Sequence, residues 1–337
     1  MSGVRRLSRF LDPYVLALLG TVLLAAALPA RGTAAEAVDA ATTGFIALLF
    51  FLYGTRLSAR EALDGLRHWR LHLTILATTF ALFPLFGLAA RGLVPWLLTE
   101  ELHHGLLFLC VVPSTVQSSI AFTALARGNV AAAIAAGSFS SLAGVLLTPL
   151  LAAALIGSSG GFSADTLLGV GGQLLLPFLA GQALRRWTAG FTGRHRRALS
   201  LVDRGSILLV VYAAFSAGVN AGVWGEISWP RLVALFGVEA ALLAAMLLLT
   251  CWGGRRLGFG RNDRVPLVFA GANKSLAAGL PMAGVIFPGG QAALAVLPLM
   301  LYHQLQLIVC AVLARRWSQG PSGDAADRVA PQGPAPA

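Results

Sequence analysis

The chain has 337 residues, of which 57% are hydrophobic and only 12% are charged, and its mean hydropathy is +0.75. Soluble domains carry about 25% charged residues, and a soluble core of this size could not bury so much apolar surface, so the bilayer must solvate most of the chain. The net charge of +11 does not indicate a nucleic-acid partner, because the arginines lie in short clusters between apolar runs and no nucleic-acid-binding motif is present.

The apolar runs predict an all-α protein with ten membrane spans. A hydrocarbon core about 30 Å thick needs about 20 apolar residues of helix. The second predicted span is short, and polar residues and prolines interrupt the fourth and the ninth. In chain order the spans are Tyr14–Ala30, Ala41–Gly54, Leu71–Leu93, Leu106–Leu125, Asn129–Ile156, Ala164–Ala183, Leu199–Ala221, Pro230–Trp252, Pro266–Phe287 and Gln291–Ala314.

The distribution of basic residues supports this topology. Lysine and arginine favour the cytoplasmic side of a membrane. If the N-terminus is cytoplasmic, ten alternating spans place every basic residue on that side except Arg31, Arg91, Arg231 and the intramembrane Lys274. Removing or adding a span would spoil the alternation beyond it. We therefore expect a multi-pass protein of the cell membrane with both termini in the cytoplasm.

An alternative concerns the first span. Arg5-Arg6, an apolar stretch to Leu28 and a small residue at Ala30 also fit a secretory signal peptide. Cleavage there would leave the other nine spans without a cytoplasmic anchor at their start, so we favour a retained span.

The ten spans divide into two halves of five. An odd number of spans in each half gives the halves opposite orientations, which is the arrangement of inverted-repeat transporters. We predict a cytoplasmic N-terminus over residues 1–13, a first repeat over residues 14–156 and a second repeat over residues 164–314. Residues 318–337 are rich in proline, glycine and alanine and predict a disordered cytoplasmic tail.

The two interrupted spans occupy matching places, the fourth of five in each half. Unwound helix is costly in lipid unless protein or a water-filled cavity satisfies its backbone groups. Such paired breaks therefore indicate a binding site at the middle of the membrane, although two proline kinks that serve packing alone would leave the same pattern. The candidate site residues in the breaks are Ser114, Thr115, Gln117, Ser118, Ser119, Asn273, Lys274 and Ser275.

Three ionisable residues deep within spans are of interest. Lys274 is the only lysine of the chain; a central lysine costs about 2.5–3.5 kcal/mol on insertion scales. It is a candidate anion contact or proton-coupling group, unless it only pairs with a carboxylate or reaches the membrane surface. Glu239 is the one acid deep in a span and is a possible charge partner or proton carrier, with a structural role slightly favoured. His303 is a candidate for lining the pathway, although histidines in such places more often bond between helices.

Several of these residues carry a family resemblance. Val112–Ser119, followed by Ala126–Val130, resembles the fourth-span signature and exit of the bile acid:sodium symporter family, solute carrier family 10. Gly271–Leu276 and Leu280–Met282 resemble the branch that contains the seventh vertebrate member, and the resemblance extends over residues 11 to 316. It implies a panel of spans 1, 2, 6 and 7, a core in which spans 4 and 9 cross, and alternating access for an amphipathic organic anion driven by sodium.

The resemblance weakens at the cation ligands. Family members that bind sodium use a Ser-Asn pair in span 4, a Ser and a Thr in span 5, and a Glu and a Gln in span 9. A lysine beside the last of these positions would repel sodium. The matching residues here are Ser118 and Ser119 in span 4, Ala133 and Gly137 in span 5, and Phe269 and Asn273 in span 9.

These observations favour a secondary transporter whose partners are a small organic anion and the lipid bilayer. Sodium or a proton could be its coupling ion, and we expect no other cofactor. The alternative is a membrane regulator or an ion or lipid sensor that binds a ligand at the crossover without transport. No HExxH or paired-aspartate motif suggests an enzyme. The sequence does not define the oligomeric state.

Overall fold

A computed structural model describes residues 13–56, 68–160, 164–287 and 290–319, and all regular structure within these ranges is helical. The expected cytoplasmic N-terminus and disordered tail lie outside these ranges, apart from residues 13, 318 and 319. Among the described residues before 161 there are nine helical elements: α2 (Pro13–Ala27), α3 (Thr33–Arg56), α5 (Trp69–Ala77), the π-helix η2 (Thr78–Leu82), α6 (Phe83–Ala89), the 3-10 helix η3 (Ala90–Leu93), α7 (Glu100–Val111), α8 (Val116–Leu125) and α9 (Val130–Gly160).

The second half of the chain continues in the same way. Each of the ten predicted spans coincides with a helix, with a run of consecutive helices or with a broken pair. The elements after residue 163 are α10 (Ala164–Arg194), α11 (Arg196–Asn220), the 3-10 helix η4 (Val223–Glu226), α12 (Trp229–Arg256), α13 (Arg261–Ala272), α14 (Leu276–Ile286) and α15 (Gln291–Ser318).

The membrane-spanning character is shown for most of these elements. Six helices of the described part are long and apolar enough to cross a bilayer, and the bent α7–α8 pair makes a seventh. The protein is therefore a multi-pass, all-helical membrane protein. α2 is apolar but has only 15 residues, and α13 and α14 are shorter still, so the full number of ten spans stays a prediction.

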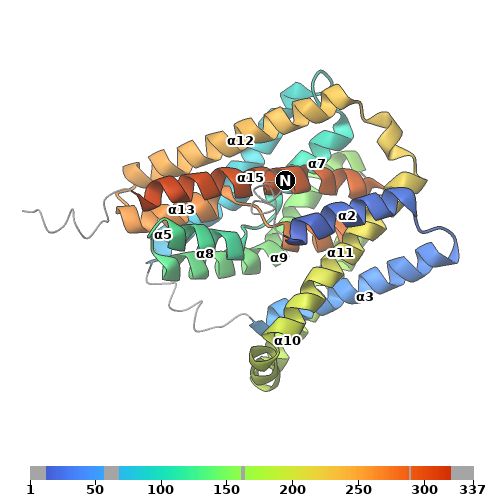
Figure 1. Cartoon of the computed structure of the whole chain (residues 1–337), viewed down its shortest axis with the longest axis horizontal. Coiled ribbons are helices and arrows are strands. Elements are labelled where there is room, and N and C mark those ends of the chain that lie inside the picture. Colours follow the sequence, from blue (N-terminus) through green and yellow to red (C-terminus); the bar gives the residue numbers. More distant parts are fainter. Residues whose placement is uncertain (1–12, 57–67, 161–163, 288–289, 320–337) are drawn as a thin grey trace, which may run out of the picture.

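The helices pack in two groups. α2, α3, α10 and α11, which we call the panel, are linked by contacts with one another. α5 to α9 and α12 to α15, which we call the core group, form a second set of contacts that includes the α7–α15 pair. In Figure 1 the panel helices lie toward the lower right, α12 and α15 run across the upper half of the molecule, and α13 lies at the left. The two groups meet mainly where α11 contacts α14 and α15 and where α10 contacts α9.

Glycines permit the closest contact within the panel. A Cβ atom on Gly54 of α3 would overlap the carbonyl oxygen of Phe178, and a Cβ atom on Gly181 of α10 would overlap that of Phe51. Small residues at such crossings let two helix backbones approach directly, which is a common source of packing in membranes. The pair fixes α3 against α10 near the boundary with the core group.

Two interruptions in the core group prepare the site. α7 and α8 are bent by 62° at the break between Val111 and Val116, where Pro113 cannot donate a helical hydrogen bond. α13 and α14 are separated by the extended residues Asn273 to Ser275. Both breaks occur where the sequence predicted them.

Candidate functional site at the helix crossover

The two breaks lie directly against each other. The backbone N–H of Ser275 donates to the carbonyl oxygen of Pro113 at 2.8 Å, and the hydroxyl of Thr115 donates to the carbonyl oxygen of Lys274 at 2.6 Å. Residues about 160 positions apart in sequence therefore hydrogen-bond as adjacent extended segments. The breaks cross in contact, as the matched interruptions predicted.

Side chains satisfy the backbone groups that the α7–α8 break frees. A regular helix would use the N–H of Ser114 on the carbonyl of Cys110, but here that N–H donates to the hydroxyl of Ser140 at 2.9 Å. The carbonyl of Val111 accepts from the hydroxyl of Thr148 at 2.8 Å. Because no water is available in the bilayer core, these serine and threonine hydroxyls stabilise the unwound segment.

The α13–α14 break is satisfied in a matching way. The N–H of Lys274 would normally bond the carbonyl of Ala270, but it donates to the side chain of Gln306 at 2.7 Å. Instead, the hydroxyl of Ser114 donates to the carbonyl of Ala270, and the hydroxyl of Tyr302 donates to the carbonyl of Ala272 at 2.8 Å. Ser114 therefore belongs to one break and caps the helix that ends at the other.

Lys274 makes the reciprocal contact: it belongs to the second break, and its side chain bonds to backbone carbonyls at the first. Its side chain is fully buried, and Nζ donates to three backbone carbonyls, those of Thr79, Cys110 and Val112, at 2.9, 2.7 and 2.9 Å. The ring of Phe83 covers Nζ from 4.1 Å to its centroid. An ammonium group has three N–H donors, so all of them have acceptors here.

Glu239 does not pair with Lys274. Both carboxylate oxygens are buried without a hydrogen-bond partner, and the ion pairs of the described residues are Arg56–Asp203 and Arg91–Glu100. The possible Glu239–Lys274 pair is therefore not formed among the described residues, where three backbone carbonyls accept from the ammonium group instead. A buried carboxyl without hydrogen-bond partners must be stabilised in another way, such as by protonation or by a bound ion.

Other predicted residues lie in the protein interior beside the breaks. Ser119 donates to the carbonyl of Phe269 at 3.3 Å, and the side-chain oxygen of Asn273 accepts from the thiol of Cys310 at 3.3 Å. The amide nitrogen of Asn273 and the hydroxyl of Ser118 are buried without a hydrogen-bond partner in the described part of the chain. His303 lies one helical turn from Gln306, with 2.8 Å between Nδ1 and Nε2. His303 thus contacts the group that supports Lys274.

A cavity of about 290 Å³ opens beside the crossover, between the panel and the core group. Three predicted residues line it, namely Thr115, Gln117 and Ser275. Of the remaining predicted residues, Ser114 and Lys274 bond across the breaks. The other lining residues are Phe50, Tyr53 and Arg56 of α3, Val116 of α8, Ser138, Ser141, Leu142 and Val145 of α9, Phe178 of α10, and Ala277, Ala278 and Met282 of α14.

Two helix N-termini reach this cavity. α8 begins at Val116 and α14 at Leu276, and residues of both first turns line the space. Ser275 caps α14, whereas the hydroxyl of Thr115 is committed to Lys274 and makes no cap on α8. The first N–H groups of α8 therefore lack a capping side chain. N–H groups and dipoles at helix N-termini attract anions.

Arg56 is the charged lining residue that sequence reasoning missed. It was assigned with the other arginines to a cytoplasmic segment, yet its side chain lines the cavity and forms an ion pair with Asp203 of α11. No local motif marks it. Its position at the end of an apolar run, three residues after the aromatic Tyr53, gives only a weak signal.

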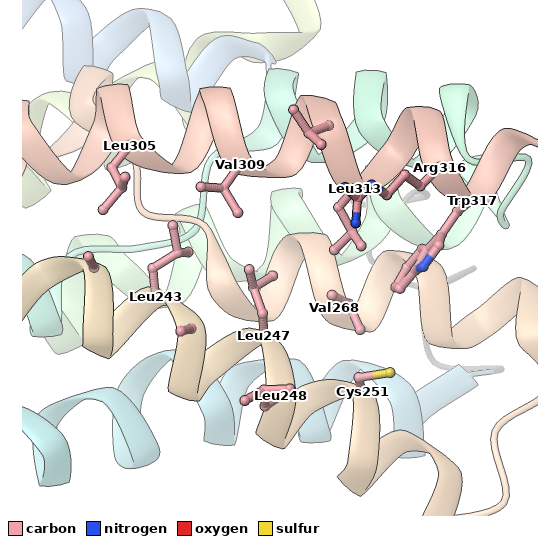
Figure 2. A pocket seen from close by; sticks show the side chains of 13 residues that line it. Leu243, Leu247, Leu248, Cys251, Val268, Leu305, Val309, Leu313, Arg316 and Trp317 are labelled. Atoms are coloured by element: carbon pink, nitrogen blue, oxygen red, sulfur yellow. The ribbon is translucent and has the colours of Figure 1, made fainter.

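A second hollow, of about 460 Å³, lies between α12, α13 and α15 and holds none of the predicted site residues. Figure 2 shows its aliphatic lining, with Arg316 and Trp317 together at one end. A selective small-molecule site combines an apolar lining with several convergent polar groups. The hollow has polar groups at one end only, so we assign the candidate site to the crossover cavity.

Comparisons with known proteins agree on one family. The model of the SBF-like CPA transporter family matches residues 12–319. An uncharacterized protein of Pseudomonas aeruginosa is 51% identical over 314 residues, which cover 92% of this chain and 94% of that protein. "Putative symporter YfeH" of Escherichia coli is 44% identical over 93% of this chain and 95% of its own length. Sodium/bile acid cotransporter 7 of Rattus norvegicus is 30% identical over 80% of each chain.

Proposed function

We propose, on the premise that this chain belongs to the SBF-like CPA transporter family, that it carries an amphipathic organic anion across the membrane by alternating access. Membership makes the chain a membrane transporter and not an enzyme. The observation that supports the substrate class is the crossover cavity, where two helix N-termini meet an apolar wall.

The cavity suits a molecule with one charged and one apolar end. Phe50, Leu142, Phe178 and Met282 form apolar walls, while Gln117 lies at the start of α8. An anionic group would accept hydrogen bonds from the uncapped N–H groups of α8, and the apolar body would lie against the panel. The name of the rat relative, a sodium/bile acid cotransporter, is in keeping with this class.

The topology supports alternating access. In our proposal the chain crosses the membrane ten times as two inverted repeats, residues 14–156 and 164–314, with both termini in the cytoplasm. The cavity lies at the boundary between the panel and the core group. Movement of one group against the other would open such a cavity to alternate sides while the crossed breaks keep their internal bonds.

We propose a proton as the coupling ion. Glu239 is a fully buried carboxyl whose oxygens lack partners in the described structure. Proton relays in membrane transporters use carboxylates placed in this way. Three of the six positions that match sodium ligands of the bile acid:sodium symporter family carry Ala133, Gly137 and Phe269 here, and none of these three side chains has an oxygen.

The experiment is uptake into proteoliposomes. Purified protein is tested with labelled cholate, a steroid carboxylate, under imposed proton and sodium gradients. We expect uptake that a proton gradient accelerates. Ser141→Trp fills the cavity and should lower the initial rate more than tenfold, whereas Leu150→Trp, at an exposed position of the same helix, should not. Equal rates for both variants would refute the site.

A thermal-shift assay separates transport from sensing. If cholate raises the melting temperature but no flux occurs under any gradient, the chain binds anions at the crossover without transport. That result would favour the membrane-sensor alternative over the transporter.

A further inference from the structure

The strongest unassigned feature is the set of three carbonyl oxygens around Nζ of Lys274, which we call the carbonyl cage: Thr79, Cys110 and Val112. Each oxygen is free of helical bonding for a separate reason. The N–H that would reach Cys110 belongs to Ser114 and is bonded to Ser140. Val112 lies beyond the last residue of α7 in extended conformation. Two of the cage oxygens are thus products of the first helix break.

The third oxygen comes from the π-helix η2. The N–H of Phe83 donates to Thr78 in the π-helical manner and not to Thr79. The next residue, Pro84, has no N–H. The carbonyl of Thr79 therefore has neither an α-helical nor a π-helical donor and points to Lys274. π-Bulges with such freed carbonyls are frequent at functional sites.

The cage has the properties of a cation site. Three carbonyl oxygens converge within 2.7–2.9 Å of one point, and two of them mark the C-terminal end of α7, where the helix dipole is negative. The aromatic face of Phe83 lies on another side at 4.1 Å. Carbonyls of unwound helices and half-helix C-termini are the groups that coordinate mobile cations in broken-helix transporters.

We propose that Lys274 is a built-in cation: its ammonium group permanently fills a monovalent-cation site at the crossover, so this point binds no mobile ion in the native protein. The four-carbon side chain enters the cage from the second break and joins three segments, η2, α7 and the α13–α14 break. A tethered cation cannot dissociate, and therefore a sodium gradient cannot act through the cage. This inference does not depend on which substrate the protein carries.

The proposal predicts that removing the side chain creates a cation site. In Lys274→Ala the cage would keep its oxygens and gain space for an ion with water. The melting temperature of this variant in detergent, measured in choline chloride, should fall below that of the native protein. Ammonium or methylammonium chloride at constant ionic strength should then raise it by several degrees in a saturable way, and sodium should do so less strongly. The native protein should melt at the same temperature in all four salts.

Two further variants separate a cation site from general destabilisation. Lys274→Met fills the same space without charge, and its melting temperature should fall without recovery in any salt. Tyr302→Phe removes the hydroxyl that donates to Ala272 in the same break, and it should also melt lower without a response to cations. A folded Lys274→Ala variant without a cation-dependent shift, or recovery of Tyr302→Phe to the same degree, would overturn the proposal.

The native protein provides a test that does not depend on the folding of variants. Crystals grown with Tl⁺ in place of Na⁺ should show no anomalous peak within 4 Å of the three cage oxygens. A peak there would mean that a mobile cation occupies the cage beside or instead of Lys274, and would overturn the proposal.

Discussion

The side-chain amide of Gln306 forms a two-bond clamp on the backbone of Lys274: Oε1 accepts from its N–H at 2.7 Å, and Nε2 donates to its carbonyl oxygen at 2.8 Å. The amide thus replaces, on both sides of one residue, the helical bonds that the α13–α14 break removes. The clamp holds the backbone from which the lysine side chain enters the carbonyl cage. In our proposal, binding at the crossover depends on a segment that has no regular structure of its own.

Gln306→Leu should therefore be strongly destabilising. The substitution keeps the approximate volume but leaves the N–H of Lys274 unsatisfied in a buried place, where the penalty is about 1–3 kcal/mol for each group. The carbonyl of Lys274 would still accept a hydrogen bond from the hydroxyl of Thr115. Thermal unfolding in detergent should show a clear decrease in melting temperature. An unchanged melting temperature would mean that water replaces the clamp.

Gln306→Glu provides the contrasting substitution. The carboxylate can still accept from the N–H of Lys274, but an ionised glutamate cannot donate to its carbonyl or to His303. We expect its stability to lie between those of the native protein and Gln306→Leu at neutral pH, and to approach the native value as acid protonates the glutamate. The same melting assay from pH 5 to pH 8 measures this, and a pH-independent difference from the native protein would contradict it.

The α3–α10 contact predicts a position-specific effect of one methyl group. Gly54→Ala places a Cβ atom against the carbonyl of Phe178, and overpacking of this kind costs about 1–3 kcal/mol. Gly44→Ala lies on the same helix with no atom within 4 Å of its Cβ, so it should not lower stability. Equal melting temperatures for the two variants would show that α10 can move away from α3 without cost.

Arg56 should set the affinity for anions. Arg56 lines the cavity, and its guanidinium forms an ion pair with Asp203. Arg56→Gln should weaken cholate binding about tenfold, which corresponds to the loss of one charge-assisted contact of about 1.4 kcal/mol. Asp203→Asn should release the guanidinium and strengthen binding.

The matched control for Arg56 is Arg91→Gln, which breaks an exposed ion pair with Glu100 away from the crossover. Titration calorimetry in detergent can compare the variants. Similar affinities for Arg56→Gln and Arg91→Gln would remove Arg56 from the anion site.

Glu239→Gln tests the proton as coupling ion. The amide is close in shape to the protonated carboxyl but cannot release a proton. We expect the variant to keep its melting temperature and to bind cholate, while its uptake no longer responds to an imposed proton gradient. A variant that still responds to the gradient at the native rate would exclude Glu239 as the proton carrier.

The sequence predicted the helical class and both broken helices, because apolar length, proline and clustered polar residues are local signals. It also predicted that the two breaks meet. It could not predict how their hydrogen bonds are exchanged. Ser114 caps Ala270 and Lys274 caps Cys110 across about 160 residues, and no periodicity in the chain records such pairs.

The role of Lys274 shows the same limit. As the only lysine in a polar break, it was a candidate for direct contact with an anion or for proton coupling. The structure places its three donors on backbone oxygens, one of them freed by a π-helix that the sequence marks only by Pro84. The threonine and serine hydroxyls beside the breaks likewise satisfy the backbone more often than they line the cavity.

The central claim is that an anion crosses by movement of the panel against the core group around the crossover cavity. Tyr53 of α3 and the carbonyl of Ala277 in α14 bridge the two groups across this cavity at 3.4 Å. The test measures cholate uptake by a variant with Tyr53→Cys and Ala277→Cys, in a background without the three native cysteines, before and after cross-linking with Hg²⁺. Our account predicts that the double-cysteine variant takes up cholate, that Hg²⁺ cross-linking stops this uptake, and that dithiothreitol restores it. Hg²⁺ should leave the uptake of either single-cysteine variant unchanged. Undiminished uptake by the cross-linked protein, or no uptake before cross-linking, would contradict it.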